Sequence, residues 1–160
     1  MEAGEPLKIT ATKDSKVFAE CARLMSQSDP WIILGLPYEY CTKAFEGDFR
    51  EVFLAEYEME PVGFVIMQTQ GTFKGYIQTI FIKESWRGRG LGKKLIQFCE
   101  DRIFKYSPNV FICVSSFNQG ALQLYEELGY KKVGALDNFL KEGYAELLYR
   151  KTLGPIVGYL

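Results

Sequence analysis

The sequence predicts one domain over residues 1–160 of the α/β (α+β) class, with helices flanking a mixed, mostly antiparallel sheet. The middle of the chain is rich in β-branched and aromatic residues, which favour consecutive strands. The later part alternates strand-like with helix-like segments, which indicates that some neighbouring strands are parallel. Hydrophobic residues make up 48% of the 160 residues, so a core can form without disulfides or metal.

The first part of the chain predicts a strand and two helices. Asp14 or Ser15 can cap the first helix, whose apolar residues recur on one face. Pro30 ends helical structure, because it lacks an N–H and disfavours helix in the residue before it. Gly47 closes the second, shorter helix. The expected ranges are 7–10 for the strand and 15–26 and 38–45 for the helices.

The middle of the chain predicts a hairpin followed by a third strand. Two strand-like runs are separated by a turn at residues 59–61, which include a proline. Gly71 and Gly75 then interrupt the pattern, and the next run is again β-branched and aromatic. The expected strands are 51–57, 62–69 and 76–82.

The later part of the chain predicts two helices and three strands. Apolar residues recur at helical spacing in the first helix, and Pro108 follows it. The next strand is apolar throughout, as a strand buried on both faces would be. Asn118 caps the second helix and Gly129 follows its end. The expected helices are 91–106 and 119–128, and the strands are 110–114, 131–136 and 144–151. The whole chain therefore predicts about seven strands and about four helices.

Composition excludes several classes of function. The net charge of −1 and the pI of about 5.6 argue against a nucleic-acid partner. The chain contains no histidine, which removes imidazole catalysis and argues against a bound metal such as zinc. None of the four cysteines belongs to a CxxC pair, so we expect buried thiols in a reducing compartment. They are Cys21, Cys41, Cys99 and Cys113.

The chain carries no signal of a membrane partner. Its first residues are polar and lack the apolar region of a signal peptide. No apolar run approaches the ~20 residues that a membrane span needs. We therefore expect a cytoplasmic protein.

A glycine-rich, basic turn at residues 86–95 lies between a predicted strand and a predicted helix. Glycines allow a ligand to approach the backbone closely, and the N-terminus of the following helix attracts anions. The turn is therefore a candidate phosphate site, although a purely structural turn with solvated charges is the alternative. It matches neither a P-loop nor a dinucleotide fingerprint, because a required glycine is absent from each. Four basic side chains surround it: Arg87, Arg89, Lys93 and Lys94.

Two motifs, one with Arg87, Gly90 and Gly92 and one with Asn118, Ala121 and Tyr125, resemble those of the GNAT superfamily of N-acetyltransferases. Arg87, Gly90 and Gly92 match the pyrophosphate-binding motif, which is Arg or Gln, two residues, Gly, one residue, and Gly or Ala. Segment 118–130 resembles the later family pattern through Asn118, Ala121, Leu124, Tyr125, Gly129 and Tyr130. The order of expected elements also resembles this fold from Leu7 to Leu153.

The resemblance implies an acetyl-CoA-dependent N-acetyltransferase of GNAT-type fold that uses no metal. The glycine turn would hold the pyrophosphate of coenzyme A. The strand before the turn would pair with the pantetheine arm, and it would splay from the strand at 110–114 to leave room for the thioester. The implied coenzyme-binding residues are Ile80, Phe81, Ile82, Arg87, Gly88, Arg89, Gly90, Leu91, Gly92, Lys93, Asn118, Ala121 and Tyr125.

The resemblance also implies a catalytic role for Tyr125. A phenol stays protonated at neutral pH and can give a proton to the departing thiolate of coenzyme A. A backbone N–H near Ile82 would stabilise the oxyanion. Helical spacing alone equally fits Tyr125 as a packing residue and Asn118 as a helix cap.

The general base stays open. Many family members have a carboxylate near the start of the strand before the turn, but this chain has Tyr76, Gln78 and Thr79 there. Glu84 before the turn is more typical of a solvated carboxylate. An ordered water, or the small neutral fraction of the amine, could serve instead. Three carboxylates are candidates by location alone: Glu56, Glu58 and Glu146.

The acceptor is expected where the first helices cover the sheet. Aromatic and acidic side chains in that region suit a cationic amine, although ordinary packing and solvation explain them equally well. A small amine, a lysine side chain and a peptide N-terminus all remain open. The residues in question are Trp31, Tyr38, Glu39, Tyr40, Phe45, Glu46 and Asp48.

Two further possibilities come from the same sequence. A catalytically silent coenzyme-binding module, acting as a sensor or interaction partner, would explain the missing strand carboxylate. An enzyme that transfers a longer acyl group would share every motif. Separately, the apolar segment 154–160 is expected to pack on the domain or across a homodimer interface.

Overall fold

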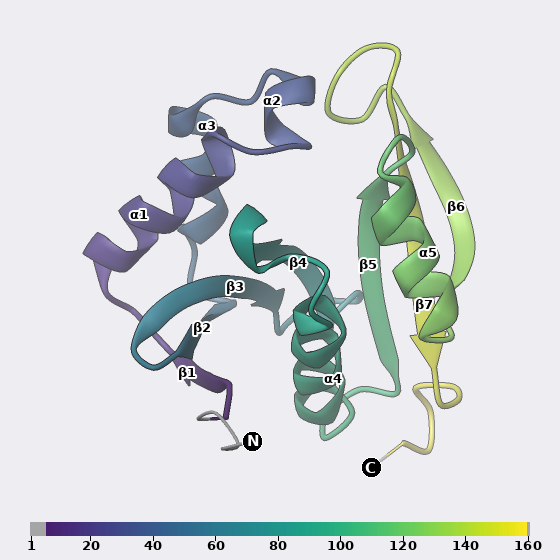
Figure 1. Cartoon of the computed structure of the whole chain (residues 1–160). Helices are drawn as coiled ribbons and strands as arrows, with labels where there is room; N and C mark the ends of the chain where they lie inside the picture. The colour runs from purple at the N-terminus through teal and green to yellow at the C-terminus, as the bar shows by residue number, and fades with distance from the viewer. Residues whose placement is uncertain (1–5, 160) are drawn as a thin grey trace.

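The computed structural model describes residues 6–159, and its strands form one seven-stranded sheet within that range (Figure 1). The strand order is β1-β2-β3-β4-β5-β7-β6, and every neighbouring pair is antiparallel except β4 with β5. The predicted mixed, mostly antiparallel sheet is therefore confirmed. The strands are β1 (Lys8–Ala11), β2 (Arg50–Tyr57), β3 (Glu60–Gln68), β4 (Tyr76–Ile82), β5 (Asn109–Ser115), β6 (Lys131–Asp137) and β7 (Ala145–Thr152).

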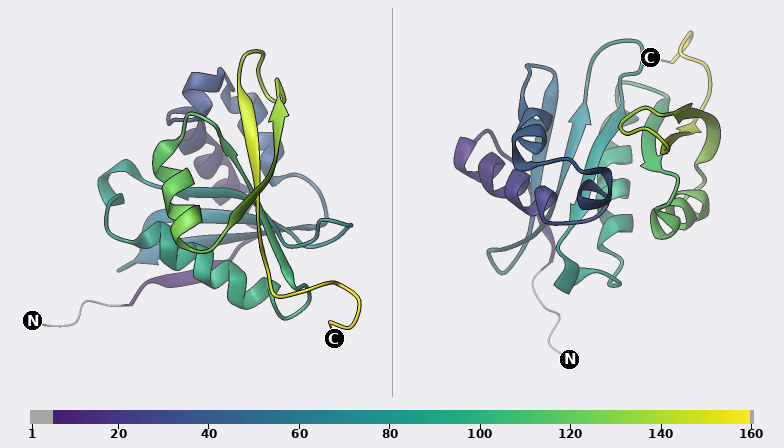
Figure 2. Two further views of the ribbon diagram at one scale, coloured as in Figure 1. Left: turned by 90° about the vertical axis from the view of Figure 1, so that its right-hand side faces the viewer. Right: turned by 90° about the horizontal axis from the view of Figure 1, so that it is seen from above.

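Helices cover the two faces of this sheet. The first three helices gather on one side, whereas α4 lies on the other side (Figure 2). Asp14 caps α1 by accepting from the Lys16 N–H, and Asn118 caps α5 by accepting from the Ala121 N–H, as predicted. The helices are α1 (Ser15–Ser26), α2 (Trp31–Leu34), α3 (Tyr38–Thr42), η1 (Lys43–Phe45), η2 (Glu84–Trp86), α4 (Leu91–Ile103) and α5 (Gln119–Glu127).

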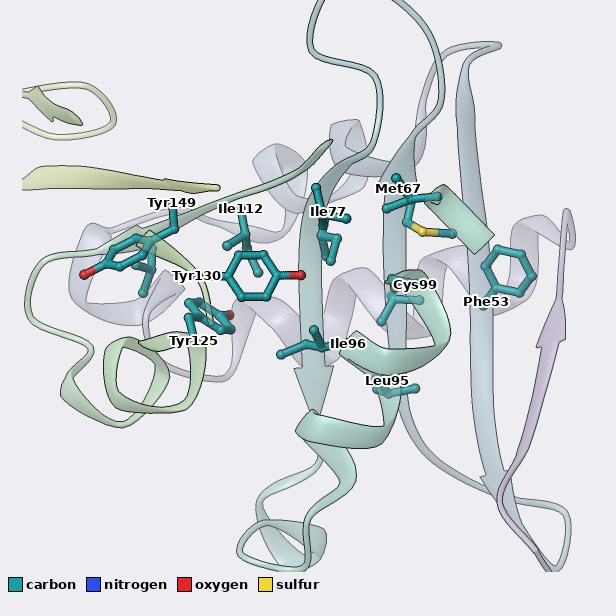
Figure 3. Packing of buried hydrophobic residues seen from close by; sticks show 14 of the residues in the cluster. Phe53, Met67, Ile77, Leu95, Ile96, Cys99, Ile112, Tyr125, Tyr130 and Tyr149 are labelled. Carbon is teal, nitrogen blue, oxygen red and sulfur yellow. The ribbon is translucent and has the colours of Figure 1, made fainter. Parts of the chain in front are cut away.

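Two hydrophobic cores follow from the alternation of side chains along the central strands. Val52 belongs to the core under α1 and α3, while its neighbour Phe53 belongs to the core under α4. Figure 3 shows the core under α4. Tyr125 from α5 and Tyr149 from β7 lie on one side of Ile77, and Phe53 lies on the other side. The sheet is therefore buried on both faces around β3 and β4.

Three local details differ from the sequence-based expectations. The hairpin turn lies at Glu58 and Met59, both with positive φ, and not at residues 59–61. Pro61 instead lies in β3 opposite Glu56, beside a register shift that leaves the next residue of β3, Val62, without a partner on β2. The short helix α2 was not predicted, because Pro30 indicated a break. The helix predicted to reach residue 106 ends at Ile103.

The cysteines are free thiols. Cys21, Cys41 and Cys99 are buried as expected, whereas Cys113 is only half-buried. Burial raises the pKa of Cys21 and of Cys99 to about 12, so both stay protonated at neutral pH. Over residues 6–159, no helix is long and apolar enough to cross a membrane.

The parallel strands β4 and β5 separate soon after they meet. Their pairing is limited to Tyr76 with Phe111 and Ile77 with Ile112, although β4 continues to Ile82. A register shift between β3 and β4 beside Gln78 changes the direction of β4 at the same point. The fold therefore opens a gap in the middle of its sheet.

Segment 154–160 makes one contact that can be tested. The Tyr159 hydroxyl donates to the main-chain carbonyl of Phe104, while Ile156 and Val157 are exposed. We expect removal of residues 154–160 to lower the melting temperature by roughly 2–4 °C, since a lost hydrogen bond costs about 1 kcal/mol. Thermal unfolding and the mass in solution measure this.

The matched control replaces Ile156 and Val157 by Ser and keeps Tyr159. If the Ile156 and Val157 side chains form a dimer contact, the control should have the mass of a monomer in solution. It should still form the hydrogen bond from Tyr159 to the Phe104 carbonyl. A shortened protein with the parent's melting temperature and mass would show that the segment contributes to neither.

Candidate functional site

Two cavities meet at the gap between β4 and β5. The first, the turn cleft, has a volume of about 750 Å³ and lies against the glycine turn and the start of α4. The second, the inner cavity, has a volume of about 560 Å³ and lies between the first helices and the sheet. Both volumes suit small-molecule ligands. Five residues line both cavities: Pro30, Trp31, Ile80, Asn118 and Tyr125.

The turn cleft exposes backbone amides. Gly88 and Gly90 have φ values of +75° and +78°, and nothing lies within 4 Å of a Cβ built on either. Within residues 6–159, the N–H groups of 90–93 donate to no protein acceptor, as is usual in the first turn of a helix. Together with the positive end of α4, these amides form a site for an anion such as a phosphate.

The four basic side chains of the turn separate into two pairs. Arg87 and Lys93 line the cleft, and the Arg87 Nε donates to the Ile82 carbonyl at 3.0 Å. Arg89 does not line it; its guanidinium lies 4.6 Å from the Trp86 ring centre. Lys94 also points away, with its Nζ 3.4 Å from the Tyr57 hydroxyl. The structure thus directs Arg89 away from the predicted ligand.

The remaining predicted coenzyme-binding residues line the cleft together. Its walls come from the end of β4, from the turn itself and from the start of α5. Gly92 allows the close approach of two helices, because a Cβ there would lie 3.3 Å from the Leu124 side chain. The residues brought together are Ile80, Phe81, Ile82, Arg87, Gly88, Gly90, Leu91, Gly92, Lys93, Asn118, Ala121 and Tyr125.

Tyr125 lies where the two cavities join. Its side chain packs in the core under α4 and is only 8% exposed, yet it lines both cavities. Among the described residues its hydroxyl makes no hydrogen bond. Burial raises the pKa of Tyr125 above the usual value for a phenol, so the group keeps its proton at neutral pH. Tyr125 therefore packs in the core and also lines both cavities.

Glu146 is the carboxylate of the inner cavity. It lies on β7, is 6% exposed, and accepts a hydrogen bond from the Ser115 hydroxyl at 2.5 Å. Burial raises the pKa of Glu146, and the Ser115 bond offsets part of that rise. The other two candidates line neither cavity, since Glu58 is in the exposed hairpin turn and Glu56 is on β2.

The side chains beside Glu146 are neutral. Tyr76, Cys113 and Ser115 line the inner cavity with it, and burial raises the pKa values of Tyr76 and Cys113. No residue of β4 provides a carboxylate there, because Tyr76, Gln78 and Thr79 occupy those positions. Glu146 reaches the site from β7, opposite Ser115 of β5. Sequence spacing alone could not have indicated this pairing.

Only part of the expected acceptor region lines the inner cavity. Trp31 and Tyr40 line the inner cavity, but Phe45 is buried in the core under α1. The expected acids do not line it, and the charged side chains that do, besides Glu146, are Lys43 and Arg50. Four of the residues expected in the acceptor region do not line the cavity: Tyr38, Glu39, Glu46 and Asp48.

The loop between β6 and β7 closes the cavity from the other side. Phe139 and Leu140 of this loop line it, and Lys141 donates to the Ile33 carbonyl of α2 at 3.0 Å. Figure 1 shows this loop beside α2, far from it in the sequence. The sequence contained no signal for this contact, because it joins a loop to a short helix more than 100 residues away in the chain.

Comparison with known proteins gives consistent results. The model of the acetyltransferase (GNAT) family matches residues 18–130. An N-alpha-acetyltransferase of Sulfurisphaera tokodaii is 27% identical over 127 residues, which are 69% of this chain and 76% of that protein.

Solved structures show the same fold. The ribosomal-protein-alanine N-acetyltransferase of Escherichia coli has a TM-score of 0.74 at 15% identity, covering 97% of this chain and 99% of that one. An aminoglycoside 6'-N-acetyltransferase complexed with coenzyme A has a TM-score of 0.71 at 17% identity, covering 92% and 98%.

Proposed function

The chain belongs to the GNAT acetyltransferase family, and from that premise we propose that it moves an acetyl group from acetyl-CoA to a primary amine in a ternary complex. The acceptor is a small amine, a lysine side chain or a peptide N-terminus. The observation that carries the proposal is the pair of cavities that share Tyr125 at the gap in the sheet. Coenzyme in one cavity and amine in the other would meet at that residue.

The turn cleft fits coenzyme A. The free amides of 90–93 and the side chains of Arg87 and Lys93 would hold the pyrophosphate. Beyond Ile77, the edge of β4 that faces β5 has no strand partner, so it would pair with the extended pantetheine arm. The gap would then direct the thioester towards Tyr125.

Residues near the gap would supply the base, the oxyanion donor and the acid that the transfer needs. Glu146 would accept the proton of the amine as its nitrogen attacks the thioester carbonyl. A backbone N–H of β4 near Ile82 would stabilise the oxyanion. As the carbon–sulfur bond breaks, Tyr125 would give its hydroxyl proton to the departing thiolate.

An acceptor screen tests the proposal. Purified protein is mixed with acetyl-CoA and panels of small amines, lysine peptides and peptides with free N-termini, and free thiol is followed. We expect release above the no-acceptor rate with at least one panel. Tight acetyl-CoA binding without such release would favour the sensor function instead. Longer acyl-CoA donors tested on the same acceptor would show the preferred acyl group.

The pyrophosphate assignment predicts the effect of Gly90→Asp. An aspartate there places a like charge against the ligand, so we expect acetyl-CoA affinity to fall at least ~10-fold, the size of one lost contact to a charged group. Isothermal calorimetry measures this.

Gly71→Asp is the matched control for Gly90→Asp. Gly71 also has a positive φ and open space around its Cβ position, but it lies outside the turn cleft. The control should bind acetyl-CoA normally. Unchanged affinity in a folded Gly90→Asp protein would contradict the assignment.

A further inference from the structure

Arg50 is held in a fixed orientation inside the inner cavity. It is half-buried at the start of β2, and its Nε donates to the Gln78 Oε1 at 2.8 Å. The same oxygen accepts from the Gln68 Nε2 at 3.0 Å, and the Gln78 Nε2 donates to the Ala44 carbonyl at 3.0 Å. One hydrogen bond therefore orients the guanidinium, and two further bonds fix the Gln78 side chain that accepts it.

Within residues 6–159 the outer nitrogens of Arg50 form no hydrogen bond and no ion pair, although Nη1 lies beside Gly47. Its neighbour Glu51 faces α4 and pairs with Arg102 at 2.7 Å, since successive strand residues point to opposite faces. No carboxylate of the described chain lies within ion-pair distance of Arg50. Lys43, which also lines the cavity, forms no ion pair either. A half-buried guanidinium without a counter-ion is suited to a planar anion of a ligand.

Among residues 6–159, one carboxylate lines the cavity, and it lies far from Arg50. Glu146 is on β7 and Arg50 is on β2, and four steps between neighbouring strands separate them. At about 4.8 Å a step, this is roughly 19 Å between backbones, before the gap at β4 is counted. The two side chains shorten the distance but do not bring the charges together. The cavity is therefore cationic at one end and anionic at the other.

We propose that Arg50 forms a carboxylate subsite, so that the acceptor is a small primary amine with a carboxylate at the opposite end of the molecule. This rests on the proposed function, because the amine end is placed by Glu146 and Tyr125. The carboxylate would take the two outer nitrogens of Arg50, with Lys43 adding positive charge. A plain α-amino acid, whose two charged groups are adjacent, does not span the cavity.

A series of unbranched ω-amino acids, each paired with the alkylamine of the same length, tests this subsite. In the parent protein we expect one length of ω-amino acid to exceed its alkylamine in kcat/KM by roughly 10-fold or more. Arg50→Gln should remove that preference, so that the ω-amino acid and its alkylamine react with similar kcat/KM. Arg50→Lys should keep part of it. Arg150→Gln, which removes an exposed arginine outside the cavity, should keep all of it.

Binding measured by calorimetry with coenzyme A present separates this inference from the catalytic one. If no amine is acetylated but ω-amino acids bind in an Arg50-dependent way, the subsite stands and the proposed transfer fails. If amines are acetylated and no ω-amino acid exceeds its alkylamine, the subsite is overturned and the transfer stands. An equal fall in kcat/KM for the ω-amino acid and for its alkylamine in a folded Arg50→Gln protein also overturns the carboxylate subsite.

Discussion

Replacing Tyr125 by Phe is expected to lower kcat about 10²-fold while leaving acetyl-CoA affinity nearly intact. The ring continues to pack under α4, and only the hydroxyl that faces the gap is lost. General acid catalysis is commonly worth ~10²–10⁴ in rate, and a coenzyme thiol is already a fair leaving group, so the low end applies. Turnover, coenzyme affinity and melting temperature are measured on one preparation.

Tyr130→Phe is the matched control. Tyr130 is also buried in the same core and loses a hydroxyl, but it lines neither cavity. A packing role for Tyr125 predicts lower stability with normal turnover for each folded molecule. A kcat for Tyr125→Phe within about twofold of the parent, less than ~0.5 kcal/mol of barrier, would show that Tyr125 is not the acid.

Glu146→Gln should have an effect of similar size. Glutamine keeps the shape and can still accept from Ser115, but it cannot take the amine proton, so we expect kcat/KM to fall about 10²-fold. The parent's activity should decline on the acid side as Glu146 is protonated, at a pH above the usual range for glutamate because its pKa is raised. The variant's profile should lack this decline.

Glu146→Gln should not lower stability, although it lowers activity. Because burial raises the pKa of folded Glu146 above its unfolded value, the group's contribution to stability is full below the unfolded pKa and is lost as pH rises through the folded pKa. Glutamine does not ionise, so the variant should melt at the parent's temperature or higher at pH 7. Glu127→Gln, an exposed change on α5, should alter neither property. Full activity in Glu146→Gln would exclude it as the base.

The fold was largely predictable because its strong local patterns agree with its tertiary structure. The run at β4 combines β-branched and aromatic residues and begins and ends as predicted, and both helix caps form the expected bonds. The hairpin turn was misplaced because Glu58 and Met59 adopt positive φ without being glycine, which no residue preference indicates. The helix α2 is short and forms where proline indicated a break.

The site was predictable where it depends on contiguous motifs. The glycine turn and the start of α5 each hold their residues in one short segment, so the resemblance of these two motifs to those of the family predicted that they share one site. Glu146 and Arg50 reach the inner cavity through strand order and register, which join β7 and β2 to the same space. Residues brought together by pairing over long sequence distances carry no local signal, and that is why the general base stayed open.

The most direct measurement of the central claim compares the two products of one reaction. With the best acceptor from the screen, free thiol and acetylated amine are quantified together, the second by mass spectrometry. Direct transfer predicts one acetylated amine for each thiol released, with both lowered in step by Tyr125→Phe. Thiol release without acetylated amine, or no release in a protein that binds acetyl-CoA, would contradict the account.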